Sequence, residues 1–144
     1  MEYLVAVDGS DGSRAAVDHA KRVARRSGGS VTLVHAVDPG SYANAHAPAA
    51  DDRHHSVDDA ARHGRELLAD FAADLRAEGV SVGATHLRFG EPATVLTDLA
   101  TADDVAEVVV GHRGLPAQSG RVLGSVAKDV IDDAPVPVTV VGSG

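Results

Sequence analysis

Hydrophobic positions along the chain follow two patterns that alternate from one end to the other. Short runs of β-branched and other apolar residues are typical of buried strands, and longer segments with apolar residues three or four positions apart predict amphipathic helices. The short runs predict strands at 3–8, 31–37, 80–89, 105–110 and 138–141. The longer segments predict a helix that ends at 27–29, one from about 57 to 78, one that opens at Pro92, and one that carries apolar residues from Val122 to Ile131.

Strands that alternate with helices in this way predict the fold class. The crossovers are expected to be right-handed, which gives a parallel sheet with helices on both faces. No internal repeat and no linker divides the 144 residues. We therefore predict one doubly wound α/β domain that spans residues 1–144.

One segment, residues 39–56, breaks the alternation. It has no apolar period and is rich in Ala and His, so we expect a long, mobile loop there. Its histidines (His46, His54 and His55), with His63 further on, raise the question of a metal site, because imidazole is a common metal ligand. No cysteine and no fixed helical pair supports such a site. Histidines exposed to solvent are the preferred interpretation, and we predict no metal held by protein side chains alone.

Composition narrows the classes of protein to which the chain can belong. The absence of cysteine excludes disulfides, thiolate zinc sites and cysteine nucleophiles. A net charge of −8 argues against a nucleic-acid partner, because such binding needs a positive contact face. No apolar run approaches the roughly 20 residues that cross a bilayer. The first apolar run is interpreted as a strand and not a signal peptide, so we expect a cytoplasmic protein with no membrane partner.

The charged residues are of an informative kind. Asp outnumbers Glu by 16 to 5, and Lys occurs only at positions 21 and 128 against 11 Arg. An acidic, lysine-poor chain is typical of proteins that stay soluble in concentrated salt, because carboxylates remain hydrated while salt screens their repulsion. A halophilic protein and a composition bias of the gene are both compatible with these counts.

The candidate chemistry lies where strands end. In open parallel sheets, ligands bind beyond the carboxyl ends of the strands, near the point where strand order reverses. After the strand at 105–110 the chain reads Gly111-His112-Arg113-Gly114, then nine residues, then Gly124-Ser125 at the start of a helix. Glycines let a phosphate approach backbone N–H groups, and a helix N-terminus adds donors and partial positive charge. The spacing therefore predicts a phosphate-binding loop.

Side chains of the loop are expected to contribute a hydroxyl group and positive charge to phosphate binding. A simpler, purely structural interpretation of the loop competes with this one. Ser125 offers a hydroxyl to the anion or its metal, and Arg113 and Arg121 offer charge, while His112 is equally compatible with a phosphate contact and with a turn that faces water. In the simpler interpretation the glycines only form a turn and Ser125 only caps the helix.

Several blocks of the chain, in the same order, resemble the universal stress protein family. The glycine loop fits that family's nucleotide signature, Gly-x2-Gly-x9-Gly-[Ser/Thr], without a gap. The matching blocks, which cover nearly all of the chain, are Val5 to Ser10, Leu33 to Pro39, Gly90 to Ala93, Gly111 to Ala127 and Ala134 to Val138.

The resemblance implies a fold, a ligand and an assembly. The fold is a Rossmann-like, adenine nucleotide α-hydrolase-like sheet of five parallel strands in the order 3-2-1-4-5. The ligand is ATP with Mg²⁺ or Mn²⁺, and Asp8 is expected near either the ribose or the phosphate-bound metal. The assembly is a homodimer through the last strand, Val138 to Val141. The nucleotide-binding residues implied are Ala6, Val7, Asp8, Ala36, Val110, Gly111, Gly114, Gly124, Ser125 and Val126. Leu115-Pro116 departs from the polar residues usual after the second glycine.

Three hypotheses for function remain open from the sequence. The first is an ATP-binding stress-response or signalling module with at most slow hydrolysis. The second is a metal-dependent ATPase or nucleotidyl-transfer enzyme that uses Asp8, although no nucleophile with an adjacent base can be named. The third is an interaction protein whose glycine loop is only structural. His35 is expected to be a hydrogen-bonded core residue, and Ser27-Gly28-Gly29-Ser30 a turn that ends a helix.

Overall fold

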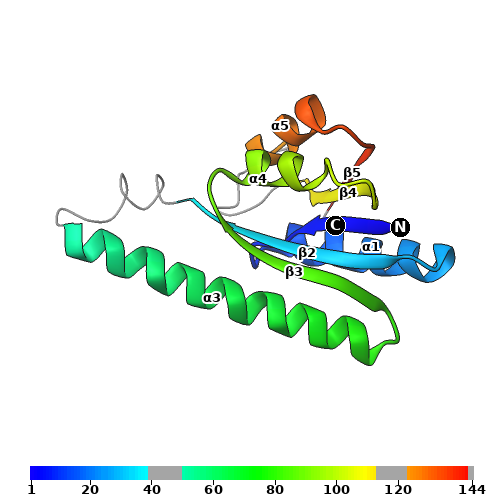
Figure 1. The fold of residues 1–144 in the computed structure, drawn as a ribbon, viewed down its shortest axis with the longest axis horizontal. Helices are drawn as coiled ribbons and strands as arrows, with labels where there is room; N and C mark the ends of the chain where they lie inside the picture. Colours follow the sequence, from blue (N-terminus) through cyan, green and yellow to red (C-terminus); the bar gives the residue numbers. More distant parts are fainter. Residues whose placement is uncertain (39–49, 113–122, 143–144) are drawn as a thin grey trace.

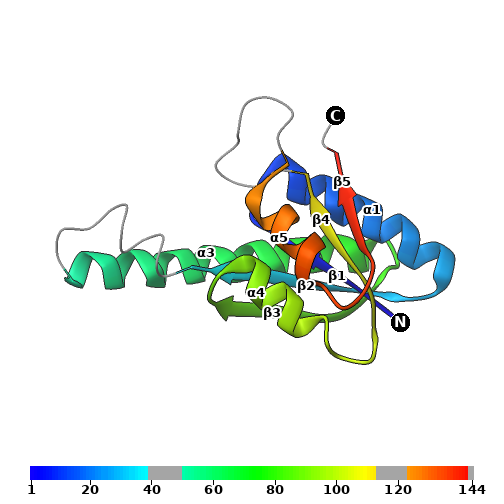
Figure 2. The ribbon, with the colours of Figure 1, turned by 90° about the horizontal axis from the view of Figure 1, so that it is seen from above.

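The computed structural model describes residues 1–38, 50–112 and 123–142, with backbone alone over 50–56. Its centre is a sheet of five parallel strands in the order β3-β2-β1-β4-β5, which confirms the predicted fold class and strand order. Figure 2 shows β5 and β3 at opposite edges of this sheet. The strands are β1 (Glu2–Ala6), β2 (Ser30–Val37), β3 (Ser81–Phe89), β4 (Val105–Gly111) and β5 (Val138–Val141).

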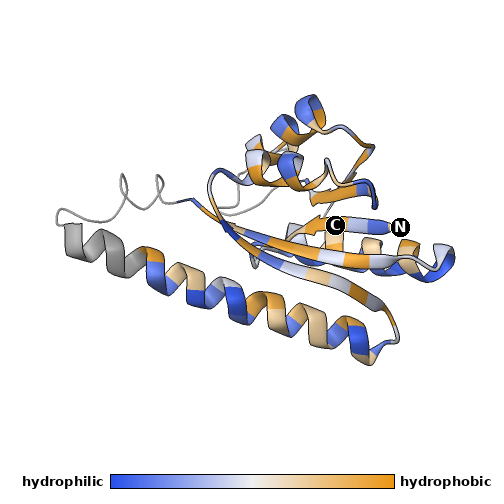
Figure 3. Ribbon diagram, viewed as in Figure 1, coloured by the Kyte–Doolittle hydropathy of each residue, from blue (hydrophilic) through white to orange (hydrophobic). Residues whose placement is uncertain are grey.

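In the described part of the chain, four helices cover the two faces of the sheet. They are α1 (Asp11–Ser27), α3 (Ala50–Ala77), α4 (Pro92–Leu99) and α5 (Ser125–Asp133). Helices α1 and α3 lie on one face, and α4 and α5 lie on the other (Figure 1). Hydrophobic and hydrophilic residues alternate along α3, as expected for a helix with one buried side (Figure 3).

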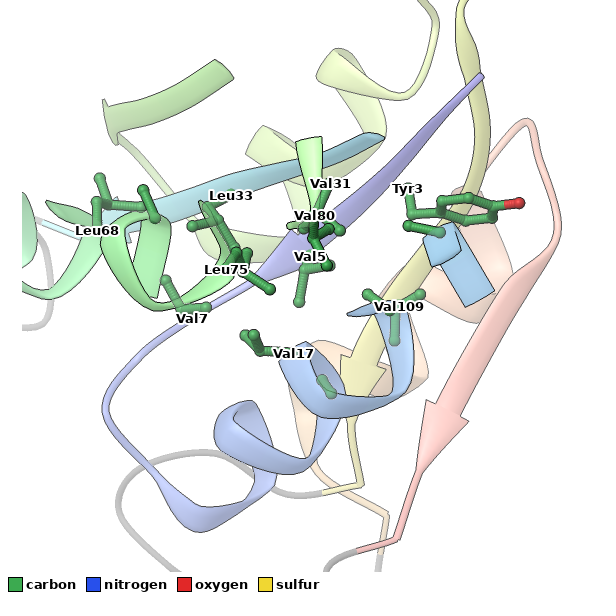
Figure 4. Close-up of a cluster of buried hydrophobic side chains, with 14 residues drawn as sticks. Tyr3, Val5, Val7, Val17, Val31, Leu33, Leu68, Leu75, Val80 and Val109 are labelled. Carbon is green, nitrogen blue, oxygen red and sulfur yellow. The ribbon is translucent and has the colours of Figure 1, made fainter. Parts of the chain in front are cut away.

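Successive residues of β1 point to opposite faces and so supply two separate cores. Tyr3, Val5 and Val7 are buried in the core beneath α1 and α3 (Figure 4). Leu4 and the half-buried Ala6 belong to the core beneath α4 and α5. Because both faces of the central strands are covered, β1, β2 and β4 are apolar along most of their length.

Helix ends agree with the turn residues seen in the sequence. Ser10 caps α1, with its hydroxyl oxygen accepting a hydrogen bond from the Ser13 N–H at 3.0 Å. Gly28 ends the same helix at φ 75°, and Gly79 follows α3 at φ 80°. The Ser27–Ser30 segment is thus a turn that ends a helix, as predicted.

The prediction of a loop over residues 39–56 is wrong for residues 50–56. Helix α3 begins at Ala50, seven residues before the start predicted near Val57, and residues 39–49 lie outside the described part of the chain. Residues 50–56 are polar and have no apolar period. They nevertheless open with aspartates, which stabilise a helix N-terminus, and they extend a helix already held by packing further along. The last helix starts at Ser125, and Val122 lies outside the described residues.

Candidate functional site

The turn between β1 and α1 is held by its own polar groups. The Val7 N–H donates to the Val34 carbonyl at 2.8 Å, which continues the pairing with β2 beyond the last residue of β1. Asp8 Oδ1 accepts a hydrogen bond from the Ser10 N–H at 2.9 Å. Gly9 between them has φ 82°, a conformation that favours glycine. Asp8 is therefore a turn-forming residue at the carboxyl edge of the sheet, whatever else it binds.

His35, on the neighbouring strand β2, reaches this turn. Its Nδ1 lies 2.7 Å from the carbonyl oxygen of Val7, and the side chain is half-buried. The expectation of a hydrogen-bonded core histidine is confirmed.

At the end of β4 the backbone comes very close to α1. A Cβ placed on Gly111 would lie 2.5 Å from the carbonyl carbon and 2.6 Å from the carbonyl oxygen of Gly12. No side chain fits in that gap, so the first glycine of the loop is required for packing. The contact also links the end of β4 to the α1 end of the turn that carries Asp8.

The N-terminus of α5 is joined to the end of β4 by hydrogen bonds. The His112 N–H donates to the Val141 carbonyl at 2.8 Å, and the Gly124 N–H donates to the His112 carbonyl at 2.9 Å. Gly124 is the N-cap of α5 in extended conformation (φ −63°, ψ 154°). The chain therefore leaves β4 and returns within hydrogen-bond distance of the residue where it left.

The start of α5 has the chemistry of an anion site. Lys128 makes the first intrahelical hydrogen bond, to the Gly124 carbonyl at 3.0 Å, so the N–H groups of residues 125–127 precede the hydrogen-bonded ladder. Gly124 has no side chain with which to cap the helix, no other described residue caps it, and its first turn contains no acidic residue. Uncapped N–H groups and the helix dipole both favour a bound anion.

The structure brings most of the expected site residues to one edge of the sheet. Gly111, His112, Gly124 and Ser125 lie together through the hydrogen bonds between β4, β5 and the start of α5. Four others belong to the core on the α4 and α5 side: Val110 is buried, and Ala6, Ala36 and Val126 are partly buried. Val7 faces the opposite core, so only its backbone, and not its side chain, is available to a ligand at this edge. Arg113, Gly114 and Arg121 lie outside the described residues.

The described side chains offer no ready-made metal centre. Within residues 1–38, 50–112 and 123–142, no group of three or more His, Cys, Asp and Glu side chains is placed to hold a metal ion. In the same part of the chain, no helix is long and apolar enough to cross a membrane.

Sequence reasoning missed Gly12. It occupies the second position of α1, where the third residue of the helix, Ser13, already bonds to the cap. Glycine inside a helix is unfavourable by roughly 1 kcal/mol relative to alanine, so its presence there signals a close approach. The element that approaches it could not be read from the sequence.

Comparison with known proteins shows the family of the chain. Residues 2–142 match the universal stress protein family. The chain belongs to that family. A putative universal stress protein of Staphylococcus epidermidis is 30% identical over 145 residues, which covers 96% of this chain and 81% of the relative.

Solved structures of family members superpose on the whole chain. Universal stress protein UspA from Lactobacillus plantarum has a TM-score of 0.85 at 26% identity, covering 98% of this chain and 97% of its own. A universal stress protein from Archaeoglobus fulgidus, solved in complex with dAMP, has a TM-score of 0.70 at 28% identity and covers 98% and 97%. A third universal stress protein, solved in complex with cAMP, has a TM-score of 0.70 at 26% identity, and the match covers 100% of this chain and 98% of that protein.

Proposed function

We propose that this universal stress protein binds ATP at the carboxyl edge of its sheet and acts as a nucleotide-dependent stress-response or signalling module, with at most slow hydrolysis. The observation that carries the proposal is the N-terminus of α5. The N–H groups of its first turn have no cap from Gly124 and no acidic residue beside them in that turn, which favours a bound anion. The hydrogen bond from Gly124 to the His112 carbonyl holds this helix start at the end of β4. The sequence adds the Gly-x2-Gly-x9-Gly-Ser spacing around that helix start.

The fold supports an adenine nucleotide in particular. Two family members of the same fold were solved with dAMP and with cAMP. In this chain the partly buried Ala6 and Ala36 leave a small-residue surface beside Val110, at the strand ends where the ligand of such a sheet lies. Small side chains there leave room for a flat base against the backbone.

A divalent cation fits this proposal through Asp8. Its carboxylate is at the same edge of the sheet, and carboxylate and phosphate oxygens are the ligands that Mg²⁺ and Mn²⁺ prefer. Because one Asp8 oxygen already accepts the Ser10 N–H, the carboxylate is held in place by the turn. The metal would neutralise phosphate charge, and the chain itself would bind and orient the nucleotide.

The proposal extends to assembly: we infer a homodimer through β5. This edge strand contains only Val and Thr, all half-buried in the single chain. The other edge strand, β3, carries exposed Ser81, Thr85 and Arg88. Polar and charged side chains oppose pairing at an edge, whereas an apolar edge favours it.

Identification of the bound nucleotide tests the function. The purified protein is denatured, the released nucleotide is separated by chromatography, and calorimetry on the emptied protein compares ATP, AMP and GTP with and without Mg²⁺. We expect ATP in the extract and Mg²⁺-enhanced affinity for ATP over GTP. Rapid hydrolysis of ATP to ADP would show that the protein acts as an enzyme and not as a binding module. No nucleotide and no measurable affinity would leave only a structural role for the loop.

A further inference from the structure

The imidazole ring of His35 lies between the β1–α1 turn and the long helix α3. One edge of the ring places Nδ1 at 2.7 Å from the Val7 carbonyl oxygen. The opposite edge faces α3: a Cβ placed on Gly64 would lie 2.4 Å from His35 Cδ2 and 3.0 Å from Nε2. One side chain of β2 thus contacts two elements that are far apart in the sequence.

The hydrogen bond fixes the tautomer of the ring. A carbonyl oxygen can only accept, so Nδ1 carries the proton and donates it to Val7. In the neutral imidazole with this tautomer, Nε2 is the acceptor nitrogen, on the edge that faces α3.

Gly64 explains how α3 lies so close to the ring. Its missing side chain would also meet Leu87 Cδ1 at 2.8 Å, so both β2 and β3 depend on this gap. Glycine in the middle of a helix lowers helix stability by roughly 1 kcal/mol relative to alanine. That loss is understandable if the helix has to pack directly on the imidazole.

We propose that His35 is a positioning residue for the nucleotide site, held from behind by Gly64, and the proposal rests on the function proposed above. Two bonds from β2 fix the Val7 backbone: the Val34 carbonyl accepts its N–H, and His35 donates to its carbonyl. The orientation of this carbonyl sets the direction in which the chain continues to Asp8. His35 therefore determines where the Asp8 carboxylate and the Ser10 N–H lie, without touching the nucleotide.

A pair of substitutions separates positioning from packing. His35→Leu removes the donor, whereas His35→Asn keeps a side-chain N–H close to the position of Nδ1. Both variants replace the planar imidazole with a side chain of another shape, so both should lower thermal stability through packing. In the protein without nucleotide, we expect faster hydrogen exchange of the Ser10 amide, which donates to Asp8, in the Leu variant alone. We also expect ATP affinity about tenfold weaker in the Leu variant, equivalent to about 1.4 kcal/mol, and close to wild type in the Asn variant.

Two further measurements make the test decisive. The ¹⁵N spectrum of the wild-type imidazole should show a protonated Nδ1 and an unprotonated Nε2, and the reverse would overturn the proposal. Gly64→Ala should push the ring and weaken ATP binding in the same way as His35→Leu, whereas Arg65→Ala, at an exposed neighbour on α3, should not.

The outcomes are distinguishable from failure of the nucleotide proposal. Equal exchange and equal affinity in the Leu and Asn variants would reduce His35 to a packing residue. If the wild type binds no nucleotide while the Leu variant still speeds exchange of the Ser10 amide, the positioning role stands and the proposed ligand is wrong.

Discussion

Gly111 and Gly12 lie in direct backbone contact, with the Cβ position of Gly111 only 2.5 Å from the Gly12 carbonyl carbon. They belong to the end of β4 and the first turn of α1. In the glycine loop, therefore, the first glycine joins two elements of the fold, while the later Gly124 begins the helix that offers N–H groups. Members of one motif have different physical roles, and substitutions can separate them.

The first prediction concerns Gly111→Ala. The added methyl group overlaps Gly12, so α1 or β4 must move, and overpacking of this kind lowers the free energy of unfolding by about 1–3 kcal/mol. Urea unfolding measures the loss. Gly142→Ala is the matched control, because nothing lies within 4 Å of its Cβ position. Equal stability of the two variants would show that α1 and β4 separate at no measurable cost.

The second prediction concerns Gly124→Val. Gly124 has φ −63°, which valine adopts without strain, so the fold should be retained. The isopropyl group should crowd an anion at the start of α5 and abolish ATP binding. Calorimetry measures affinity and circular dichroism checks the fold. Unchanged affinity would mean that this helix start does not hold the phosphates.

The third prediction concerns assembly through β5. Val140→Asp places a charge in the apolar edge strand, and burying that charge against a second copy is unfavourable. Light scattering at micromolar concentration should give a dimer for the wild type and a monomer for this variant. Thr94→Asp, on an exposed position of α4, should remain dimeric. A wild-type monomer at every concentration would contradict the assembly.

The fourth prediction concerns salt. With a net charge of −8, self-repulsion of the folded chain is screened by salt. If the acidic surface is an adaptation, the melting temperature should rise steadily from low to molar KCl. Differential scanning calorimetry decides the question. A flat or falling melting temperature would attribute the Asp and Arg content to composition bias.

The fifth prediction concerns pH and His86 on β3. Partial burial lowers the pKa of His86, and nearby Arg88 lowers it further, while Glu2 opposes both. A histidine whose pKa is lower in the folded protein binds protons more readily when unfolded, so stability should fall as pH drops through and below about 6.5.

His86→Gln should flatten that part of the stability curve, and urea unfolding between about pH 8 and about pH 5 measures it. The effect should be small, because His86 is only partly buried and solvent screens its interactions. His63→Gln, at an exposed position of α3, is the control. An identical pH slope in wild type and the His86 variant would show that another group causes it.

The sequence predicted the fold closely because its signals were local. The β-branched run from Val138 to Val141 matched β5 residue for residue, and Pro92 opened α4 where expected. The start of α3 was missed because residues 50–56 are helical without an apolar period. Their helical conformation is an extension of the packed segment from Val57 onward, and a local pattern within 50–56 does not contain that information.

The candidate site was harder to predict because its contacts cross the sheet. His35 was expected to find a hydrogen bond, but its partner, the Val7 carbonyl, depends on the register between β1 and β2. The contact of Gly12 with Gly111 needs the angle at which α1 crosses β4. Neither can be derived from spacing along the chain.

The central place of β1 has a consequence for synthesis. Of the five strands of the sheet, β1 is synthesised before the other four, yet one of its two neighbours, β4, is made only after β3. A nascent chain that ends before Val105 therefore has one side of its central strand unpaired. Contacts between distant segments are slow to form, and unpaired strand edges are prone to aggregate. The contact between Gly111 and Gly12, and the bond from Gly124 to His112, can therefore form only after β4 and the start of α5 have been synthesised.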